Sequence, residues 1–290
     1  MKQIALLIVA SLLLGQCALA ENPPSVLNDR SLLDKLSREG GRLIDAKKVV
    51  TAADLSAQLE KSAKCKLTVA ACPDKPIPDE QFYEAVKPSV VIMGGVYKCD
   101  KCNNWHVSPA SGYVIGAGGI VVTNYHVIAI GNKDTKQAMF AMTSDGRIFP
   151  VKQVLAASKA NDVAIVQLEA DKAVFKPLPI QGDAPVGSKV RVLSHPDEML
   201  FSLTEGIISR YFVMPARPNS SAGPTMMAIT ADYAKGSSGG PVLNERGAVV
   251  GMVSSTFSVY YDMKDGHQEN LQMVIKQCVP AASVLKLIEH

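Results

Sequence analysis

The sequence has little net charge and, beyond its first residues, no long apolar run. Its 30 lysine and arginine residues nearly balance 27 aspartate and glutamate residues, for a formal net charge of +3. This balance gives no electrostatic reason to expect a nucleic acid partner. A membrane-spanning helix needs about 20 apolar residues, and no such run follows the first 20 residues. We therefore expect neither nucleic acid binding nor an integral membrane span.

The first residues have the composition of an export signal. A basic residue precedes an apolar run at 4–14, and the segment closes with Ala-Leu-Ala at 18–20. This pattern predicts a signal peptide at 1–20, too short to remain as an anchor. The mature chain should then be soluble and exported, to a periplasm or to the extracellular space. Cys17 leaves a lipid anchor open, although Gln16 is bulky where lipoprotein signals have a small residue.

The number of cysteines is odd once the predicted signal peptide is removed. Six cysteines less Cys17 leave five. In an oxidising compartment cysteines pair as disulfides, and an odd number leaves one thiol over. The sequence does not determine the pairing, but at least one disulfide is expected, Cys99–Cys102 or Cys65–Cys72.

The C-x-x-C pair formed by Cys99 and Cys102 has three readings. It can be a metal half-site, a redox pair or a small disulfide loop. A zinc site would need two more ligands, of which His106 would be one and Cys65 or Cys72 the other. The exported compartment favours the structural disulfide loop, so no metal and no cofactor are predicted.

Residues 21–72 predict two short helices. An apolar leucine stripe ends at a Gly-Gly pair at 40–41, and residues 51–54 form a capping box that opens a second helix. These helices would form an inhibitory, partner-binding or oligomerising extension, or a small appendage packed on the main domain.

The segment 73–78 carries three prolines, which exclude a helix or a central strand. We place a domain boundary there. The chain then divides into a signal peptide at 1–20, a helical extension with a proline-rich linker at 21–80, and a main domain at 81–290.

The main domain has the pattern of an all-β protein. Short apolar runs alternate with glycine, asparagine, aspartate and proline, and helical periodicity is scarce before a final helix at 281–289. Many short strands without a long helix indicate barrels or a sandwich. The candidate strands are residues 89–97, 112–115, 120–123, 138–142, 151–156, 162–168, 189–194, 203–211, 226–230, 241–243, 248–254 and 271–275.

Three motifs carry candidate chemistry. Glycines flank Ser238 in the GSSGGP run, and they permit the open backbone that an exposed serine nucleophile requires. His126 follows an apolar strand in TNYHVI, and Asp162 opens another in NDVAIVQL. Taken one at a time, the GSSGGP run could be a tight bend, His126 a buried structural histidine and Asp162 a turn residue before a strand. Their occurrence in the order His, Asp, Ser favours an acyl-transfer site.

The three motifs resemble those of chymotrypsin-type serine proteases, and specifically the HtrA-like branch without its PDZ domain. The likeness covers residues 84–290. It implies a trypsin-like fold of two packed six-stranded antiparallel β-barrels with a C-terminal helix. It also implies an endopeptidase that acts through an acyl-enzyme intermediate on protein or peptide substrates. The HtrA-like branch further implies a role in protein quality control. In it Ser238 would be the nucleophile, His126 the base and Asp162 its orienting acid, with an oxyanion hole at the N–H groups of Gly236 and Ser238.

The same resemblance places a substrate pocket at Asp232, Gly251, Val253 and Ser254. Asp232 lies six residues before Ser238, the spacing of trypsin-like enzymes that prefer basic side chains. The segment around Asp232 also resembles the HtrA-like signal for small apolar side chains. We favour the apolar pocket.

Other features leave alternatives open. Ser237 is neutral where trypsin-like zymogens have an aspartate that pairs with a new N-terminal amine. Ordering of the oxyanion loop must therefore come from local hydrogen bonds, substrate, oligomer contacts or the extension. His106, His195, His267 and His290 are expected in loops or facing solvent. A protease-fold binding or chaperone-like protein with a blocked site is the alternative function, and a homo-oligomer is left open.

Overall fold

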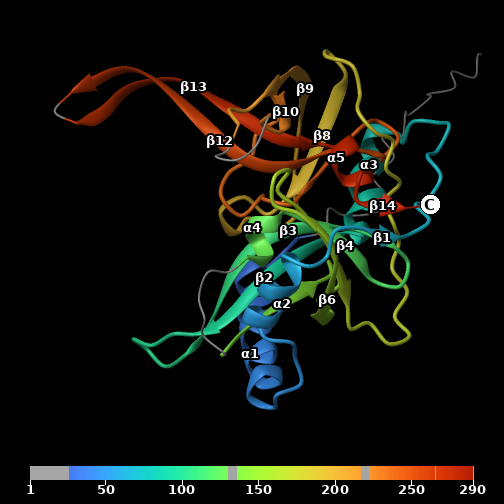
Figure 1. Cartoon of the computed structure of the whole chain (residues 1–290), viewed down its shortest axis with the longest axis vertical. Coiled ribbons are helices and arrows are strands. Elements are labelled where there is room, and N and C mark those ends of the chain that lie inside the picture. The colour runs from blue at the N-terminus through green and yellow to red at the C-terminus, as the bar shows by residue number, and fades with distance from the viewer. Residues whose placement is uncertain (1–25, 130–135, 217–221, 265, 290) are drawn as a thin grey trace, which may run out of the picture.

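Two closed six-stranded barrels make up most of the chain (Figure 1). This computed structural model describes residues 26–129, 136–216, 222–264 and 266–289. The predicted signal peptide at 1–20, with Cys17, lies outside the described residues. Within them, no helix is both long enough and apolar enough to cross a membrane. The predicted all-β fold of two antiparallel barrels is confirmed.

The first barrel is built from strands whose apolar side chains alternate between two cores. Along its first strand, Val90 and Ile92 join one buried cluster while Val91 and Met93 join another. This period of two is the direct result of strand geometry. In order around the barrel, the strands are β2 (Val90–Lys98), β3 (Trp105–Gly116), β4 (Ile120–Thr123), β7 (Val163–Leu168), β6 (Ile148–Ser158) and β5 (Gln137–Met142).

The second barrel includes a long hairpin that the sequence did not predict. Its strands β12 and β13 pair from Gly251 opposite Pro280 out to Lys264 opposite His267, well beyond the predicted 248–254 and 271–275 (Figure 1). In order, the strands are β10 (Thr225–Ile229), β13 (His267–Pro280), β12 (Val249–Lys264), β11 (Pro241–Leu243), β8 (Lys189–Ser194) and β9 (Ser202–Val213), with a short η2 (Pro196–Glu198) after β8.

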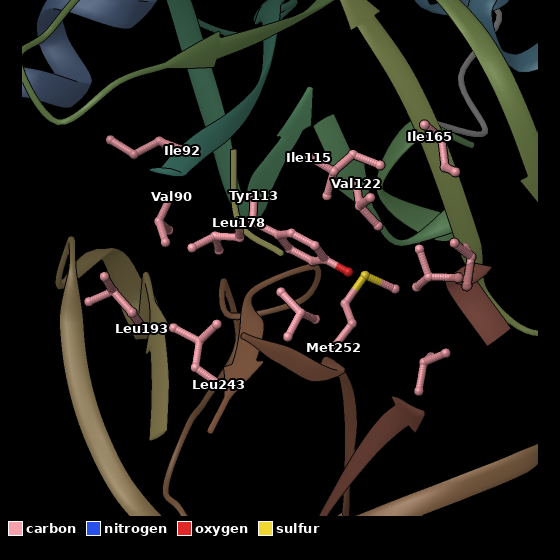
Figure 2. Packing of buried hydrophobic residues seen from close by; sticks show 14 of the residues in the cluster. Val90, Ile92, Tyr113, Ile115, Val122, Ile165, Leu178, Leu193, Leu243 and Met252 are labelled. Carbon is pink, nitrogen blue, oxygen red and sulfur yellow. The ribbon is translucent and has the colours of Figure 1, made fainter. Parts of the chain in front are cut away.

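The two barrels share one apolar core. Figure 2 shows side chains of the first barrel, among them Tyr113 and Val122, meeting Leu193, Leu243 and Met252 of the second. All five side chains are fully or almost fully buried. Burial of apolar area at about 25 cal/mol per Å² makes this shared core a main contribution to holding the barrels together.

Helix α1 (Asp29–Asp45) packs on the first barrel rather than standing free of it. Its N-terminus is capped by Asn28, whose side chain accepts from the Ser31 N–H at 3.0 Å. Leu36 is fully buried, and a Cβ on Gly94 of β2 would lie 2.6 Å from its methyl group. The bare strand surface at Gly94 therefore lets the helix approach closely.

Helix α2 (Ala52–Leu59) confirms the predicted second helix. The Thr51 hydroxyl accepts from the Asp54 N–H at 3.1 Å, as the capping motif predicts. Leu55 and Leu59 are buried in the core of the first barrel. Both helices of the extension thus share cores with the main domain, which favours the reading as a packed appendage.

The proline-rich linker runs along the second barrel. The Ile77 N–H donates to the Glu245 carbonyl at 2.9 Å. The linker then gives way to α3 (Asp79–Val86) and the short η1 (Lys87–Ser89), which lead into β2. The domain boundary near residue 80 stays a prediction.

The predicted C-terminal helix at 281–289 is correct only in its first half. Helix α5 covers Ala281–Leu285, and the chain then forms β14 (Ile288–Glu289). Strand β14 pairs in parallel with β1 (Cys65–Lys66), and the Leu287 carbonyl accepts from the Cys65 N–H at 2.9 Å. Pairing with a segment some 220 residues away has no local sequence signal, so it was missed.

The predicted disulfides are wrong for this structure. All five described cysteines are free thiols, so neither Cys99–Cys102 nor Cys65–Cys72 is formed. Cys65 is held in the β1 ladder, and the Cys102 sulfur lies 3.0 Å from a ring nitrogen of His106. The Cys99 and Cys102 thiols lie near each other but are not covalently joined.

Truncation of Leu36 should destabilise the whole fold, because its side chain fills space between α1 and β2. Leu36→Ala is expected to lower the free energy of unfolding by about 2–5 kcal/mol, measured by denaturant unfolding. Arg38→Ala on the exposed side of the same helix is the control and should change it by less than about 0.5 kcal/mol. Equal effects would show that α1 is not part of the cooperative core.

Candidate active site

Two candidate residues lie at one end of the first barrel. Strands β4 and β7 are antiparallel neighbours, with Thr123 opposite Ala164. His126 follows β4 in the short helix α4 (Tyr125–Ile128), and Asp162 directly precedes β7. The strand pairing therefore brings together two residues that are far apart in the sequence.

The Asp162 carboxylate receives hydrogen bonds from three groups. The His126 ring nitrogen Nδ1 lies 3.0 and 2.9 Å from its two oxygens, and the His126 backbone N–H donates at 3.1 Å. The Ser254 hydroxyl donates at 2.8 Å from the second barrel. With Nδ1 held by the carboxylate as a donor, Nε2 is left to accept a proton.

The backbone of Asp162 is strained into this position. Its φ is +56°, a left-handed conformation that costs a side-chain-bearing residue on the order of 1 kcal/mol or more. The Asn124 side-chain amide donates to the Asp162 carbonyl at 3.0 Å and holds the turn. Such strain is retained where the surroundings fix the conformation.

Ser238 lies in a loop that only glycine permits at two points. Gly236 and Gly239 have φ values of +92° and +86°. A Cβ on Gly239 would lie 2.2 Å from the Ser111 carbonyl oxygen, which excludes any larger residue. The Ser238 hydroxyl donates to the Ser254 carbonyl at 3.2 Å. Within the described residues it makes no hydrogen bond to His126, although both line one cavity.

Local hydrogen bonds order this loop. The backbone N–H of buried Ser111 donates to the Ser238 carbonyl at 2.8 Å, and its hydroxyl donates to the Gly236 carbonyl at 3.0 Å. The Ser194 hydroxyl donates to that of Ser237 at 3.0 Å. The carbonyls of Gly236 and Ser238 are thereby both hydrogen-bonded to Ser111. The N–H groups of Gly236 and Ser238 donate to no acceptor within the described part of the chain.

The four predicted pocket residues are not gathered around one pocket. Ser254 contacts Asp162 and Ser238, while Val253 is buried in β12 with its N–H on the Gly240 carbonyl. Gly251 is likewise buried in β12. The Asp232 side chain is 86% exposed and pairs with Lys276 at 3.3 Å, so it does not form the floor of an enclosed pocket.

Tyr233 is buried beside strand β12, the strand to which the resemblance assigns part of that pocket. Its side chain is buried, and its hydroxyl lies 2.9 Å from the Ser255 carbonyl and 2.8 Å from the Gln277 carbonyl. The Lys276 ammonium donates to the Tyr233 carbonyl at 2.6 Å. Burial raises the pKa of the tyrosine hydroxyl. No sequence motif predicted a part for Tyr233, whose only signal is an aromatic side chain five positions before Ser238.

His195 lies in the loop between β8 and η2, which agrees with the expectation of a loop position, but it is buried rather than facing solvent. Its backbone N–H donates to the Ser111 hydroxyl at 3.1 Å, and its ring Nδ1 accepts from the Phe201 N–H at 2.9 Å. Burial lowers the pKa of the imidazole to about 4. His106 and His267 are exposed as expected, and His290 lies outside the described residues.

Two hollows meet at His126. One, of about 470 Å³, is lined by His126 and Ser238 together with Tyr97, Ser108 and Pro109. The other, of about 600 Å³, is lined by His126, Asp162, Ser254 and nearby residues of the second barrel. His126 therefore has open space on two sides.

A separate cluster could hold a metal ion. The sulfurs of Cys99 and Cys102 and a ring nitrogen of His106 all lie within 4.8 Å of one another at the end of the β2–β3 hairpin. The backbone N–H groups of Cys102 and Lys101 lower the pKa of the Cys99 thiol. Cys65 and Cys72, considered as further ligands, are not members of the cluster.

Comparison with known proteins shows which proteins this chain is similar to. Residues 110–252 match the family model of the trypsin-like peptidase domain. Over 155 residues the chain is 34% identical to Protease Do-like 1, chloroplastic, of Arabidopsis thaliana, and over 157 residues it is 32% identical to a probable periplasmic serine endoprotease DegP-like of Brucella suis.

These alignments cover 51% and 52% of this chain but only 33% and 28% of the two relatives. The chain thus matches about a third of the length of those proteins. The crystal structure of Deg5 superimposes with a TM-score of 0.53 at 22% identity, covering 72% of this chain and 94% of that one. That likeness supports the fold.

Burial of neutral His195 should make the fold sensitive to acid. Its folded pKa of about 4 lies below the ordinary value of 6.5, so between these pH values the unfolded chain binds the extra proton. The free energy of unfolding should therefore fall from pH 6.5 to 4, by up to about 3 kcal/mol from this group.

Denaturant unfolding across this pH range tests the role of His195. His195→Asn keeps an acceptor for the Phe201 N–H and should show a shallower loss of stability. His267→Asn, at an exposed position, is the control with the wild-type slope. If the free energy of unfolding of His195→Asn fell with pH as steeply as that of the wild type, burial of this imidazole would not be the cause of the acid sensitivity.

Proposed function

Because the chain carries a trypsin-like peptidase domain homologous to Do-like and DegP-like proteases, we propose that it is a serine endopeptidase. The observation that carries the proposal is the contact of His126 Nδ1 with both oxygens of Asp162, beside a cavity that His126 shares with Ser238. No cofactor is needed for this chemistry.

In the proposed reaction, Ser238 attacks the scissile carbonyl while His126 Nε2 takes its proton and then delivers it to the leaving amine. Asp162 holds the imidazole and stabilises its charged form. Water then hydrolyses the acyl-enzyme by the same base. The Ser238 hydroxyl rests on the Ser254 carbonyl and would first turn toward His126. Such tightening is usual when substrate binds.

The developing negative charge would be stabilised by the N–H groups of Gly236 and Ser238. Removing one such donor in a comparable enzyme costs about 100- to 1000-fold in turnover. The hydrogen bonds of Ser111 to the two flanking carbonyls support this role, since they fix the loop in a conformation that presents the N–H groups.

The two hollows on either side of His126 support cleavage within a chain rather than at its end. Protein or peptide substrates extending in both directions could be held there. The signal-like segment at 1–20, and relatives named as periplasmic and chloroplastic, support an exported protein. The resemblance to HtrA-like proteases implies a role in protein quality control, which belongs to the same proposal.

Tyr233 would restrict the substrate side chain that precedes the cleaved bond. Its ring occupies the region between the loop before Ser238 and strand β12, anchored by hydrogen bonds to Ser255 and Gln277. Small apolar side chains would fit best. The exposed Asp232, already paired with Lys276, gives no buried charge for a basic side chain.

The blocked-site alternative has one observation in its favour, the rest position of the Ser238 hydroxyl away from His126. A complete Asp162–His126 contact argues against it. Labelling with a fluorophosphonate probe separates the two readings, since only an activated serine reacts.

Ser238→Ala and His126→Ala should each abolish probe labelling and cleavage of unfolded casein while preserving the fold. Residual activity would fall by several orders of magnitude, because nucleophile and base act as a unit. Ser258→Ala in strand β12, away from the loop around Ser238, is the matched control and should retain labelling. Undiminished cleavage by a pure Ser238→Ala preparation would contradict the proposal.

Replacing Tyr233 should change which bonds are cut. Tyr233→Ala removes the ring packed beside strand β12, so cleavage after larger apolar residues should rise about 10- to 100-fold relative to cleavage after alanine. Mass spectrometry of casein fragments gives the distribution. Tyr233→Phe keeps the ring without its hydroxyl and should keep the wild-type preference. An unchanged distribution in Tyr233→Ala would place the pocket elsewhere.

A further inference from the structure

The β2–β3 hairpin ends in a turn that gathers three metal-ligating side chains. In the run Cys-Asp-Lys-Cys-Asn-Asn-Trp-His at 99–106, the Asn103 N–H donates to the Cys99 carbonyl at 2.9 Å, and the Cys99 N–H donates to the Asn104 carbonyl at 2.9 Å. Asn103 has a φ of +56°, which reverses the chain. The turn thus returns His106 to the side of the two cysteines.

We propose that Cys99, Cys102 and His106 bind one zinc ion. Their donor atoms already lie within 4.8 Å of one another, with the Cys102 sulfur 3.0 Å from His106 Nε2. Tetrahedral zinc with bonds of about 2.3 Å to sulfur and about 2.0 Å to nitrogen brings such atoms to roughly 3.5–3.8 Å. The cluster needs only small side-chain adjustments to reach that geometry.

The ligand set selects the metal. Two thiolates and an imidazole favour zinc over magnesium or calcium, which prefer oxygen ligands. Binding displaces one proton from each thiol, and the imidazole binds in its neutral form. Three protein ligands leave the fourth position to water.

The zinc would stabilise one wall of the cavity lined by Ser238. The ring of Tyr97 stacks on His106, with centroids 5.8 Å apart and planes at 25°. Tyr97 also lines that cavity, together with Ser108 and Pro109 from β3. A metal that fixes the hairpin end would therefore order the surface that contacts substrate. This consequence rests on the proposed peptidase function, whereas zinc binding does not.

Metal titration of the reduced, full-length chain tests the site directly. One zinc per chain should bind, and cobalt(II) should give the absorption bands of a tetrahedral thiolate complex. Cys99→Ser and Cys102→Ser should each weaken affinity at least 100-fold, and His106→Asn about 10- to 100-fold. Cys72→Ser is the matched thiol control and should bind as wild type. Circular dichroism verifies that each variant is folded.

Three results would overturn the zinc site. They are no stoichiometric binding, binding that all three ligand variants retain, and protein isolated from its native compartment with a Cys99–Cys102 disulfide and no zinc. The last would restore the disulfide reading.

A second measurement tests the link to the cavity. Zinc should lower KM for peptides that extend across Tyr97 by a few fold and leave kcat unchanged, with Cys102→Ser insensitive to zinc. An unchanged KM would refute the link between zinc and the cavity but would not contradict the zinc site itself. Absence of any peptidase activity would contradict the proposed function, and the titration would still decide whether zinc binds.

Discussion

The Asp162 carboxylate is the point on which the candidate site depends, because it joins the two barrels through hydrogen bonds. His126 reaches it from the first barrel and Ser254 from the second. Neither barrel alone can supply both donors. The apolar core shared by the barrels, with Tyr113 and Met252 at its centre, sets their relative position (Figure 2). Loss of that packing would separate the acid from one of its partners before any site residue changed.

Hydrogen bonds between uncharged groups hold the loop around Ser238. A buried ion pair must overcome the large cost of removing two charges from water. In trypsin-like enzymes such an ion pair joins a new N-terminal amine to an aspartate at the position of Ser237. Here the neutral Ser194–Ser237 hydrogen bond and the two hydrogen bonds from Ser111 hold the loop instead. Each contributes on the order of 1 kcal/mol, and each satisfies a buried polar group at the same time. The loop is therefore ordered without a newly cleaved N-terminus.

The N-terminal extension supports the periphery of the same site. A Cβ on Gly41 of α1 would lie 2.4 Å from the Trp105 ring, and the Ser37 hydroxyl donates to the Trp105 carbonyl at 2.7 Å. Trp105 begins β3, next to His106 in the proposed zinc site. Helix α1, the hairpin and the cavity wall thus form one continuous packed unit, in which a change at the hairpin end can reach the cavity lined by His126 and Ser238.

The sequence by itself determined the features that local chemistry controls. Alternating apolar residues specified most strands, the threonine cap specified α2, and three short motifs identified His126, Asp162 and Ser238 as candidates. Tertiary structure alone decided the hydrogen bonds of Ser111, the burial of Tyr233 and His195, and the β1–β14 pairing. The reason is physical: these contacts join segments whose approach depends on how the barrels close and pack, and the hydrogen-bonding or burial of one residue by a distant one leaves no periodic signal in the sequence around either.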